Sequence, residues 1–245
     1  IATGVLHHYL LSKDTGFLET MWKVVEPAIE FVLDLQTPRG EIIWACHSDG
    51  TPWSYALTTG SSSISHSLRA ALAIAEHLGE DRPQWRDKGN RLVQVLRNTP
   101  EAFAPKNRWA MDWYYPVLTG VIQGTEGHDR LESKRNEFEI ADKGIRCVSD
   151  RPWITTAETC ECAMAYIAVG ENDHGIELFT KIQNYRDERG RYLTGVVYPE
   201  NVSFPENEYS TYSAAAVILA ADAILGITPA KNIFTDHGFL PSISE

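Results

Sequence analysis

The sequence predicts an all-α protein, a ring of helical hairpins with short strands at the junctions between them. Apolar helices rich in small residues alternate along the chain with amphipathic helices, as the inner and outer helices of such a ring require. Aromatic residues in polar loops open the inner helices at positions 53, 113, 153 and 209. Recurrence at about 40 to 60 residues is typical of stacked helical hairpins.

The composition is that of one globular domain. Hydrophobic residues make up 43% and charged residues 22% of the 245 residues, with no apolar run of about 18 residues that could span a membrane. We therefore expect residues 1–245 to form a single domain. The formal net charge of −11 disfavours binding to nucleic acid or to an anionic membrane, so a neutral carbohydrate is the expected partner. The sequence leaves the oligomeric state open.

The cysteines predict a reducing environment. Cys46, Cys147, Cys160 and Cys162 form no C-x-x-C motif, and no signal peptide is recognisable before them. Buried, reduced thiols in a cytoplasmic protein are the expectation that follows. The chain begins with Ile1 inside an apolar pattern, so we expect one or more N-terminal hairpins to be missing.

The helices are predicted from apolar spacing and from residues that end a helix. Phe17, Met21 and Val25 recur at helical spacing, and Pro38 ends their helix before a short strand that the β-branched pair at 42–43 predicts. The other junctions follow the same logic. Helices are expected at about 1–11, 16–35, 55–78, 83–96, 128–142, 173–185 and 212–225.

The most informative stretch runs from Arg151 to Ala168, with the sequence RPWITTAETCECAMAYIA. It predicts an extended piece ending at Trp153, a turn with two threonines, and an apolar helix whose first turns carry Glu158 and Glu161. Carboxylates three residues apart lie on one helix face. Because that face continues through alanines, we expect both carboxylates at the mouth of a packed interior, where an acid or a base is useful.

Several segments of the sequence resemble segments of known protein families. The junctions from Gln36 to Trp44 and from Gln183 to Tyr192 resemble those of the α/α toroids, which include six-hairpin glycosidases and the terpenoid cyclase and prenyltransferase toroids. The phrases ATGVLHHYL, YALTTGSSSISHSL and RWAMDWYYPVLTG look like a group of largely actinobacterial proteins labelled prenyltransferase-like or six-hairpin glycosidase-like. This resemblance spans nearly the whole chain.

The resemblance implies an α/α toroid that binds a sugar at the rim formed by the outer-to-inner loops, with two carboxylates that hydrolyse the glycosidic bond. It also implies a further acidic and aromatic hairpin upstream of Ile1, which can hold one catalytic carboxylate. The implied substrate is a neutral oligosaccharide or polysaccharide, with inversion at the anomeric carbon. A methylated mannose or glucose polysaccharide of actinobacteria is one candidate.

Glycoside hydrolysis needs one carboxylic acid and one carboxylate. The expected rim offers five candidates, which are Glu158, Asp112, Glu208, Glu161 and Asp49. Four of these have a structural alternative. Residues 155–158 also form a capping box, Asp112 can be an N-cap, and the loops of Glu208 and Asp49 can be solvated turns.

Aromatic side chains at the same rim are the candidates for sugar binding. They are Trp53, Tyr55, Trp113, Tyr114, Tyr115, Trp153, Tyr209 and Tyr212, with His47 in a neighbouring loop. Their faces suit the C–H faces of sugar rings, and the same rings can instead plug the hairpin ends.

Other functions are less well supported. An isoprenoid synthase or cyclase needs an Asp-rich magnesium site, and the chain has no adjacent Asp pair. A zinc site could use Cys160 or Cys162, for which no partner is indicated. A sugar epimerase would depend on core histidines, for which His7, His8 and His66 are the candidates. A glycan-binding toroid without activity stays open. We expect a glycosidase without metal or other cofactor.

Overall fold

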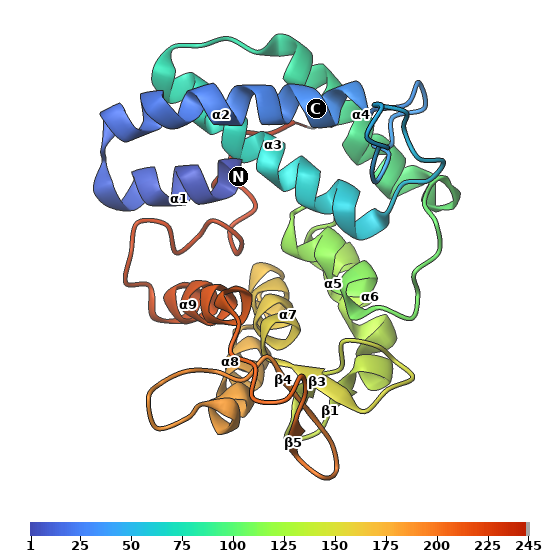
Figure 1. The fold of residues 1–245 in the computed structure, drawn as a ribbon, viewed down its shortest axis with the longest axis vertical. Coiled ribbons are helices and arrows are strands. Elements are labelled where there is room, and N and C mark those ends of the chain that lie inside the picture. Colours follow the sequence, from blue (N-terminus) through green and yellow to red (C-terminus); the bar gives the residue numbers. More distant parts are fainter. Residues whose placement is uncertain (244–245) are drawn as a thin grey trace. The chain divides into compact units, whose positions relative to one another are not determined.

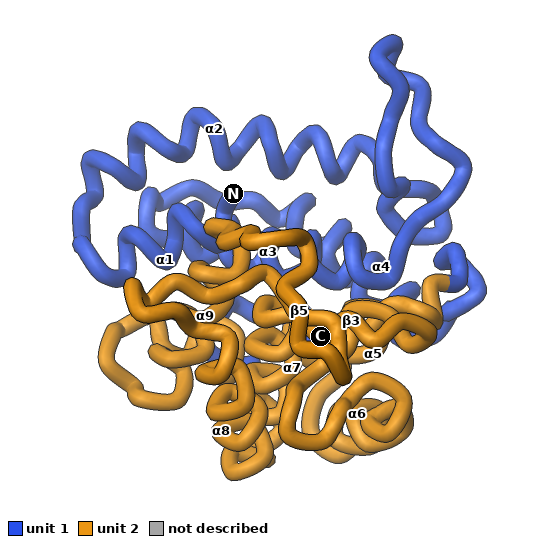
Figure 2. Tube along the Cα trace, turned by 60° about the horizontal axis from the view of Figure 1, so that its bottom comes forward, with its two compact units in different colours: residues 1–105, 119–121, 237–245 blue, residues 106–118, 122–236 orange. Residues whose placement is uncertain are grey.

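The computed structural model describes residues 1–243, and it confirms the predicted all-α fold class. Helices dominate, and no strand in these residues is longer than three residues. The described chain divides into two compact units (Figure 2). Unit 1 contains residues 1–105, 119–121 and the C-terminal residues from 237, and unit 2 contains residues 106–118 and 122–236. Whether they make one domain stays a prediction.

Unit 1 is built around α3, a helix rich in Ser and Ala that packs against α1, α2 and α4 (Figure 1). The Asp14 side chain accepts a hydrogen bond from the Phe17 N–H and so caps α2, while Gly79, at a φ of 73°, ends α3. The helices of this unit are α1 (Ala2–Ser12), α2 (Thr15–Asp34), α3 (Thr58–Leu78), α4 (Pro83–Asn98) and the short 3-10 turn η1 (Pro100–Ala102).

The C-terminal segment is held on unit 1 by one buried arginine. Arg69 of α3 donates hydrogen bonds to the backbone carbonyls of His237, Leu240 and Pro241 at 2.5 to 2.9 Å. A guanidinium buried without acceptors would be costly, so this segment and α3 stabilise each other. The strand expected at 42–43 is present only as isolated bridges, one of them between Ile43 and Ala56.

Unit 2 is built around α7, which packs against α5, α8 and α9 (Figure 1). Eleven consecutive residues of α7, from Thr156 to Tyr166, are buried, as expected for an inner helix. The helices of unit 2 are α5 (Ala110–Leu118), α6 (Gly124–Phe138), α7 (Thr156–Ala168), α8 (Asn172–Lys181), the 3-10 turn η2 (Ile182–Tyr185) and α9 (Thr211–Leu225).

Short antiparallel strands fix the start of α7. Strand β3 (Trp153–Thr155) pairs with β4 (Gly195–Val197), which also pairs with β5 (Val202–Ser203). A second pair joins β1 (Glu139–Ile140) to β2 (Gly144–Ile145). A Cβ at Gly195 would lie 2.5 Å from the Ile154 carbonyl oxygen, so only glycine allows this approach. Since β3 continues directly into α7, this pairing positions Glu158 and Glu161.

Three expected helix ranges differ from the structure. The helix expected at 55–78 begins at Thr58, and the one expected at 173–185 ends as an α-helix at Lys181 and continues as η2. The helix predicted at about 128–142 is α6, which begins at Gly124 and ends at Phe138, where the chain turns into β1. Strand pairing with β2 takes over the backbone hydrogen bonds at that point. No helix in residues 1–243 is both long and apolar enough to cross a bilayer.

Candidate active site

Glu161 is the most heavily hydrogen-bonded carboxylate of the candidates. Its Oε2 accepts a hydrogen bond from the Tyr114 hydroxyl at 2.5 Å, and its Oε1 accepts from the hydroxyls of Tyr212 at 2.7 Å and Tyr115 at 3.2 Å. Tyr114 and Tyr115 lie on α5, and Tyr212 lies on α9. One side chain of α7 therefore joins three helices of unit 2.

Burial gives Glu161 an unusual proton affinity. Loss of hydration raises its pKa to about 7, and the nearby Glu158 carboxylate acts in the same direction, whereas the hydrogen bonds from the three tyrosines oppose the rise. The same burial, together with the Glu161 charge, raises the pKa of Tyr114, Tyr115 and Tyr212. The phenols therefore stay protonated and act as donors, while Glu161 titrates near neutral pH.

Glu158 lies one helical turn before Glu161 and is 8% exposed. The Cys147 thiol interacts with its carboxylate by a hydrogen bond, and burial raises the pKa of that thiol, so it stays protonated. The capping-box alternative is wrong in its threonine half, because Thr155 at the N-cap makes no side-chain capping bond and its buried hydroxyl has no partner. Glu158 is thus a buried carboxylate at the start of α7.

The other three candidate acids are more exposed than Glu158 and Glu161 and lie near helix starts or turns. Asp112 lies partly exposed in the first turn of α5. Burial lowers the pKa of the nearby Arg130 guanidinium, and the Asp112 charge opposes this shift. Glu208 is exposed, and its backbone carbonyl accepts from Thr194. Asp49, in unit 1, accepts a hydrogen bond from the Thr51 N–H, which lowers its pKa and makes it an ordinary turn residue.

Two of the expected rim aromatics are core residues instead. The Trp113 ring is 2% exposed, stacks on Phe138 at 5.4 Å, and donates its indole N–H to the backbone carbonyls of Arg130 and Leu131. Tyr114 is fully buried. Neither ring has a face free for a sugar, which corrects the expectation of substrate contact. The reason is that most of the surface of α5 is buried, so both rings pack into the core of unit 2.

The other aromatics keep exposed ring surface. In unit 2, Tyr212 is 48% exposed, Trp153 packs edge-on against the exposed Phe204, and the Arg191 guanidinium lies 4.0 Å from the Tyr209 ring centroid. In unit 1, Trp53 lies between two of the predicted residues. Its ring centroid is 6.0 Å from that of His47 and 5.7 Å from that of Tyr55. These residues remain candidates for carbohydrate contact.

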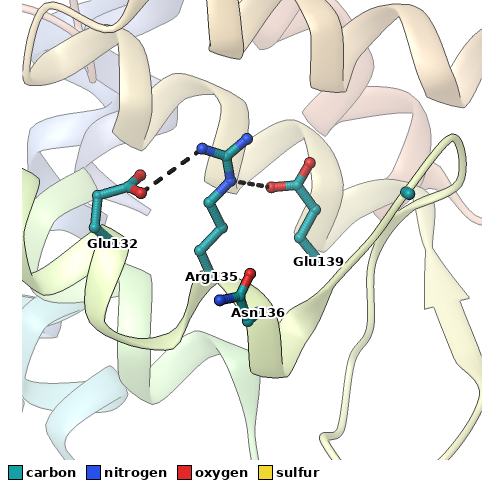
Figure 3. A pocket seen from close by; sticks show the side chains of 5 residues that line it. Glu132, Arg135, Asn136 and Glu139 are labelled. Atoms are coloured by element: carbon teal, nitrogen blue, oxygen red, sulfur yellow. Dashed lines mark hydrogen bonds and ion pairs between the residues drawn. The ribbon is translucent and has the colours of Figure 1, made fainter.

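A second charged cluster of unit 2 surrounds Glu139. A pocket of about 330 Å³ is lined by Glu132, Arg135, Asn136, Glu139 and Ala141. In Figure 3, Arg135 lies between Glu132 and Glu139, and its Nε is 3.0 Å from the Glu139 carboxylate. Lys181 and His174 also contact Glu139, at 2.8 and 3.0 Å. These partners outweigh burial and lower the pKa of Glu139 to about 2.

The same cluster has the spacing of a metal site. Ligand atoms of Glu139, His174 and Glu177 lie within 4.8 Å of one another. However, the Lys181 ammonium lies 2.8 Å from both carboxylates. A divalent cation would have to replace this lysine, so the charges already present favour an ion-pair network over a metal centre.

Sequence reasoning missed two partners at the candidate active site. The sequence indicates only an ordinary buried thiol at Cys147, whereas the structure places this thiol against Glu158. The tyrosines were expected to offer ring faces, whereas three of them offer hydroxyl groups to Glu161. No local sequence pattern indicates these hydrogen bonds, because the three tyrosines lie 46 to 51 positions from Glu161 in the chain.

Comparison with known proteins identifies similar chains. The chain matches no family model. It is 47% identical over 234 residues to the MMP endo-(1,4)-3-O-methyl-alpha-D-mannosidase of Mycolicibacterium hassiacum, and this alignment covers 96% of this chain and 65% of that relative.

Solved structures show the same fold. The GH76A α-1,6-mannanase of a Salegentibacter species matches with a TM-score of 0.60 and 12% identity, over 87% of this chain and 66% of that chain. Its inactive variant, with two consecutive aspartates changed to asparagine, was solved with α-1,6-mannotriose and matches with a TM-score of 0.61. The chain thus spans about two thirds of the length of these relatives.

These comparisons support the glycosidase-like part of the resemblance and not the prenyltransferase-like part. The structural neighbours are mannanases with the six-hairpin glycosidase-like fold, so the α/α-toroid fold class is shown. The prenyltransferase-like label is not supported, and the isoprenoid-binding alternative is not favoured. By sequence, this chain is similar over nearly its whole length to an endo-mannosidase.

Proposed function

We propose that this protein is a glycoside hydrolase that cleaves α-(1,4) linkages within a polysaccharide of 3-O-methylmannose. The observation that carries the proposal is the 47% identity to an endo-(1,4)-3-O-methyl-α-mannosidase across 96% of this chain. The buried carboxylates of α7 support it, because they supply the residue type that glycoside hydrolysis needs.

Glu158 is the proposed general acid. It donates its proton to the glycosidic oxygen as the bond from that oxygen to the anomeric carbon breaks. A water molecule adds to the anomeric carbon, and its proton passes to a second carboxylate, for which Asp112 is the proposed residue. Both side chains lie in the first turns of helices, and those helices, α5 and α7, pack against each other. Attack of water from the opposite face inverts the anomeric configuration.

The carboxylates proposed here differ from those changed in the structural neighbour. The inactive mannanase variant has two consecutive aspartates replaced. Residues 1–245 contain no adjacent Asp pair. The proposal therefore depends on Glu158 and Asp112 of this chain and not on residues transferred from the mannanase.

The test is hydrolysis of a 3-O-methylmannose polysaccharide by the purified protein, followed by the size of the products. Glu158→Gln is expected to lower kcat by about a hundredfold or more, because an amide cannot transfer the proton. Asp112→Asn is expected to have a similar effect, with unchanged binding. Glu206→Gln makes the same chemical change at an exposed position of unit 2 and serves as the control.

The outcomes separate the candidate functions. Polysaccharide binding without any hydrolysis would favour a non-catalytic glycan-binding protein. Hydrolysis that survives in both variants would reject Glu158 and Asp112 as the acid and base. Proton NMR of the first product formed distinguishes inversion from retention.

A further inference from the structure

The carboxylate of Glu161 is too fully occupied to act on a substrate directly. An ionised carboxylate has about four lone-pair positions, and three phenol hydroxyls fill most of them. The residue is 7% exposed. A general acid or base must come within about 2.6 to 3.2 Å of the reacting atom, and these hydroxyls occupy that distance around Glu161.

We propose that Glu161 is a positioning residue that holds the rings of Tyr115 and Tyr212 as a preformed surface for the carbohydrate. This inference rests on the proposed function, and it gives Glu161 a role in substrate binding instead of proton transfer. The two tyrosines reach the same oxygen, Oε1, from different helices, α5 and α9.

Tyr212 is the clearest part of this surface. Its residue is 48% exposed, yet its hydroxyl donates inward to buried Glu161 at 2.7 Å. Tyr115 interacts with the Tyr212 hydroxyl as well as with Glu161. A ring tethered at its hydroxyl end loses little further freedom when a ligand binds, and its face suits the C–H groups of a sugar.

Protonation of Glu161 would loosen this tether. Tyr114 is fully buried, and its hydroxyl would be left without an acceptor if the proton settled on Oε2. The proton is therefore expected on Oε1, where it displaces Tyr115 or Tyr212. Hydrogen bonds to a neutral acid are also weaker than those to a carboxylate.

Several titratable groups surround Glu161. They are Glu158 and Cys160 on α7, Tyr114 and Tyr115 on α5, Tyr212 on α9, and Cys147 before β3. Burial raises the pKa of both thiols and of all three phenols, so none of these five groups is expected to ionise near neutral pH. A loss of sugar affinity near pH 7 would then come from protonation of a carboxylate, and not from a change in the charge of a thiol or a phenol.

The test measures KM for the 3-O-methylmannose polysaccharide and, by calorimetry, binding of a 3-O-methylmannose oligosaccharide. Tyr212→Phe keeps the ring and removes the tether, and it is expected to raise KM and Kd about threefold while kcat changes less than twofold. Glu161→Gln is expected to raise both about tenfold. Tyr198→Phe, a tyrosine of unit 2 outside this cluster, is the control. In the wild type, affinity is expected to fall as the pH decreases through about 7, the pKa of Glu161, and both variants should lose this dependence.

Opposite results would reject the proposal. A collapse of kcat in Glu161→Gln with unchanged KM would make Glu161 a catalytic residue. Wild-type affinity in Tyr212→Phe would show that the tether is irrelevant. Tyr212→Phe is a conservative substitution at a half-exposed residue. It therefore gives a KM and a Kd even if Glu161→Gln does not fold. The binding measurement also separates the two proposals. If the protein binds the oligosaccharide without hydrolysing it, the proposed function is rejected, and the role of Glu161 in binding can still be tested.

Discussion

The hydroxyl of Tyr114 donates a 2.5 Å hydrogen bond to Oε2 of Glu161, although the two residues are 47 positions apart in the sequence. Both are buried, so neither can exchange this partner for water. The contact ties α5 to α7 and places a carboxylate with a pKa of about 7 beside Glu158.

Glu161 should make the protein less stable as the pH rises. Its pKa is about 7 in the folded state and near 4.5 when exposed, so the folded state binds the proton more tightly. Its contribution to stability is complete below about pH 4.5 and is lost as the pH rises through 7, by about 3 kcal/mol. Urea unfolding across this range should show the decline, and Glu161→Gln should flatten it. An equally steep decline in the variant would contradict the assignment.

Glu139 should have the opposite effect. Its pKa of about 2 lies below the ordinary 4.5, so its contribution is present above about pH 4.5 and is lost as the pH falls toward 2. The loss amounts to about 3 kcal/mol. Comparison of acid unfolding of the wild type with Glu139→Gln checks this. Glu137→Gln, a largely exposed neighbour, should leave the acid transition unchanged.

Lys181→Met should destabilise the protein. The substitution leaves the Glu139 carboxylate without its 2.8 Å ammonium partner, and loss of one partner of a buried ion pair costs about 3 to 5 kcal/mol. In the wild type, excess zinc should leave Tm unchanged, because Lys181 already neutralises Glu139 and Glu177. A rise in Tm with zinc would show that the cluster binds metal after all.

Trp113→Ala should lower the free energy of unfolding. The ring is fully packed, and removal of a buried Trp costs about 3 to 5 kcal/mol. Trp109→Ala, which removes a 40% exposed Trp four residues earlier, should cost much less. Chemical unfolding of both variants provides the comparison. If both variants lost only a similar, small amount of unfolding free energy, Trp113 would not be a core residue.

Thr155→Val should be neutral or slightly stabilising. The Thr155 hydroxyl is buried and has no hydrogen-bond partner, and valine has nearly the same shape without the polar group. If Thr155 instead closed a capping box, the change would cost about 1 kcal/mol. The free energy of unfolding distinguishes these cases.

The order of the helices could be predicted because it depends on local spacing. The apolar positions of α2, the small residues of α3 and the buried run of α7 each follow from sequence neighbours. The boundary of α6 could not, because pairing of β1 with β2, and not a stop signal in the helix, ends it.

The sequence alone determined that Glu158 and Glu161 share one helix face, since three residues make almost one turn. Only the tertiary structure decided what each carboxylate contacts. The partners of Glu161 are 46 to 51 residues away on α5 and α9, and Trp113 and Tyr115 of α5 differ in burial. Helical periodicity is a property of neighbouring residues, whereas hydrogen-bond partners and burial depend on how separate helices pack.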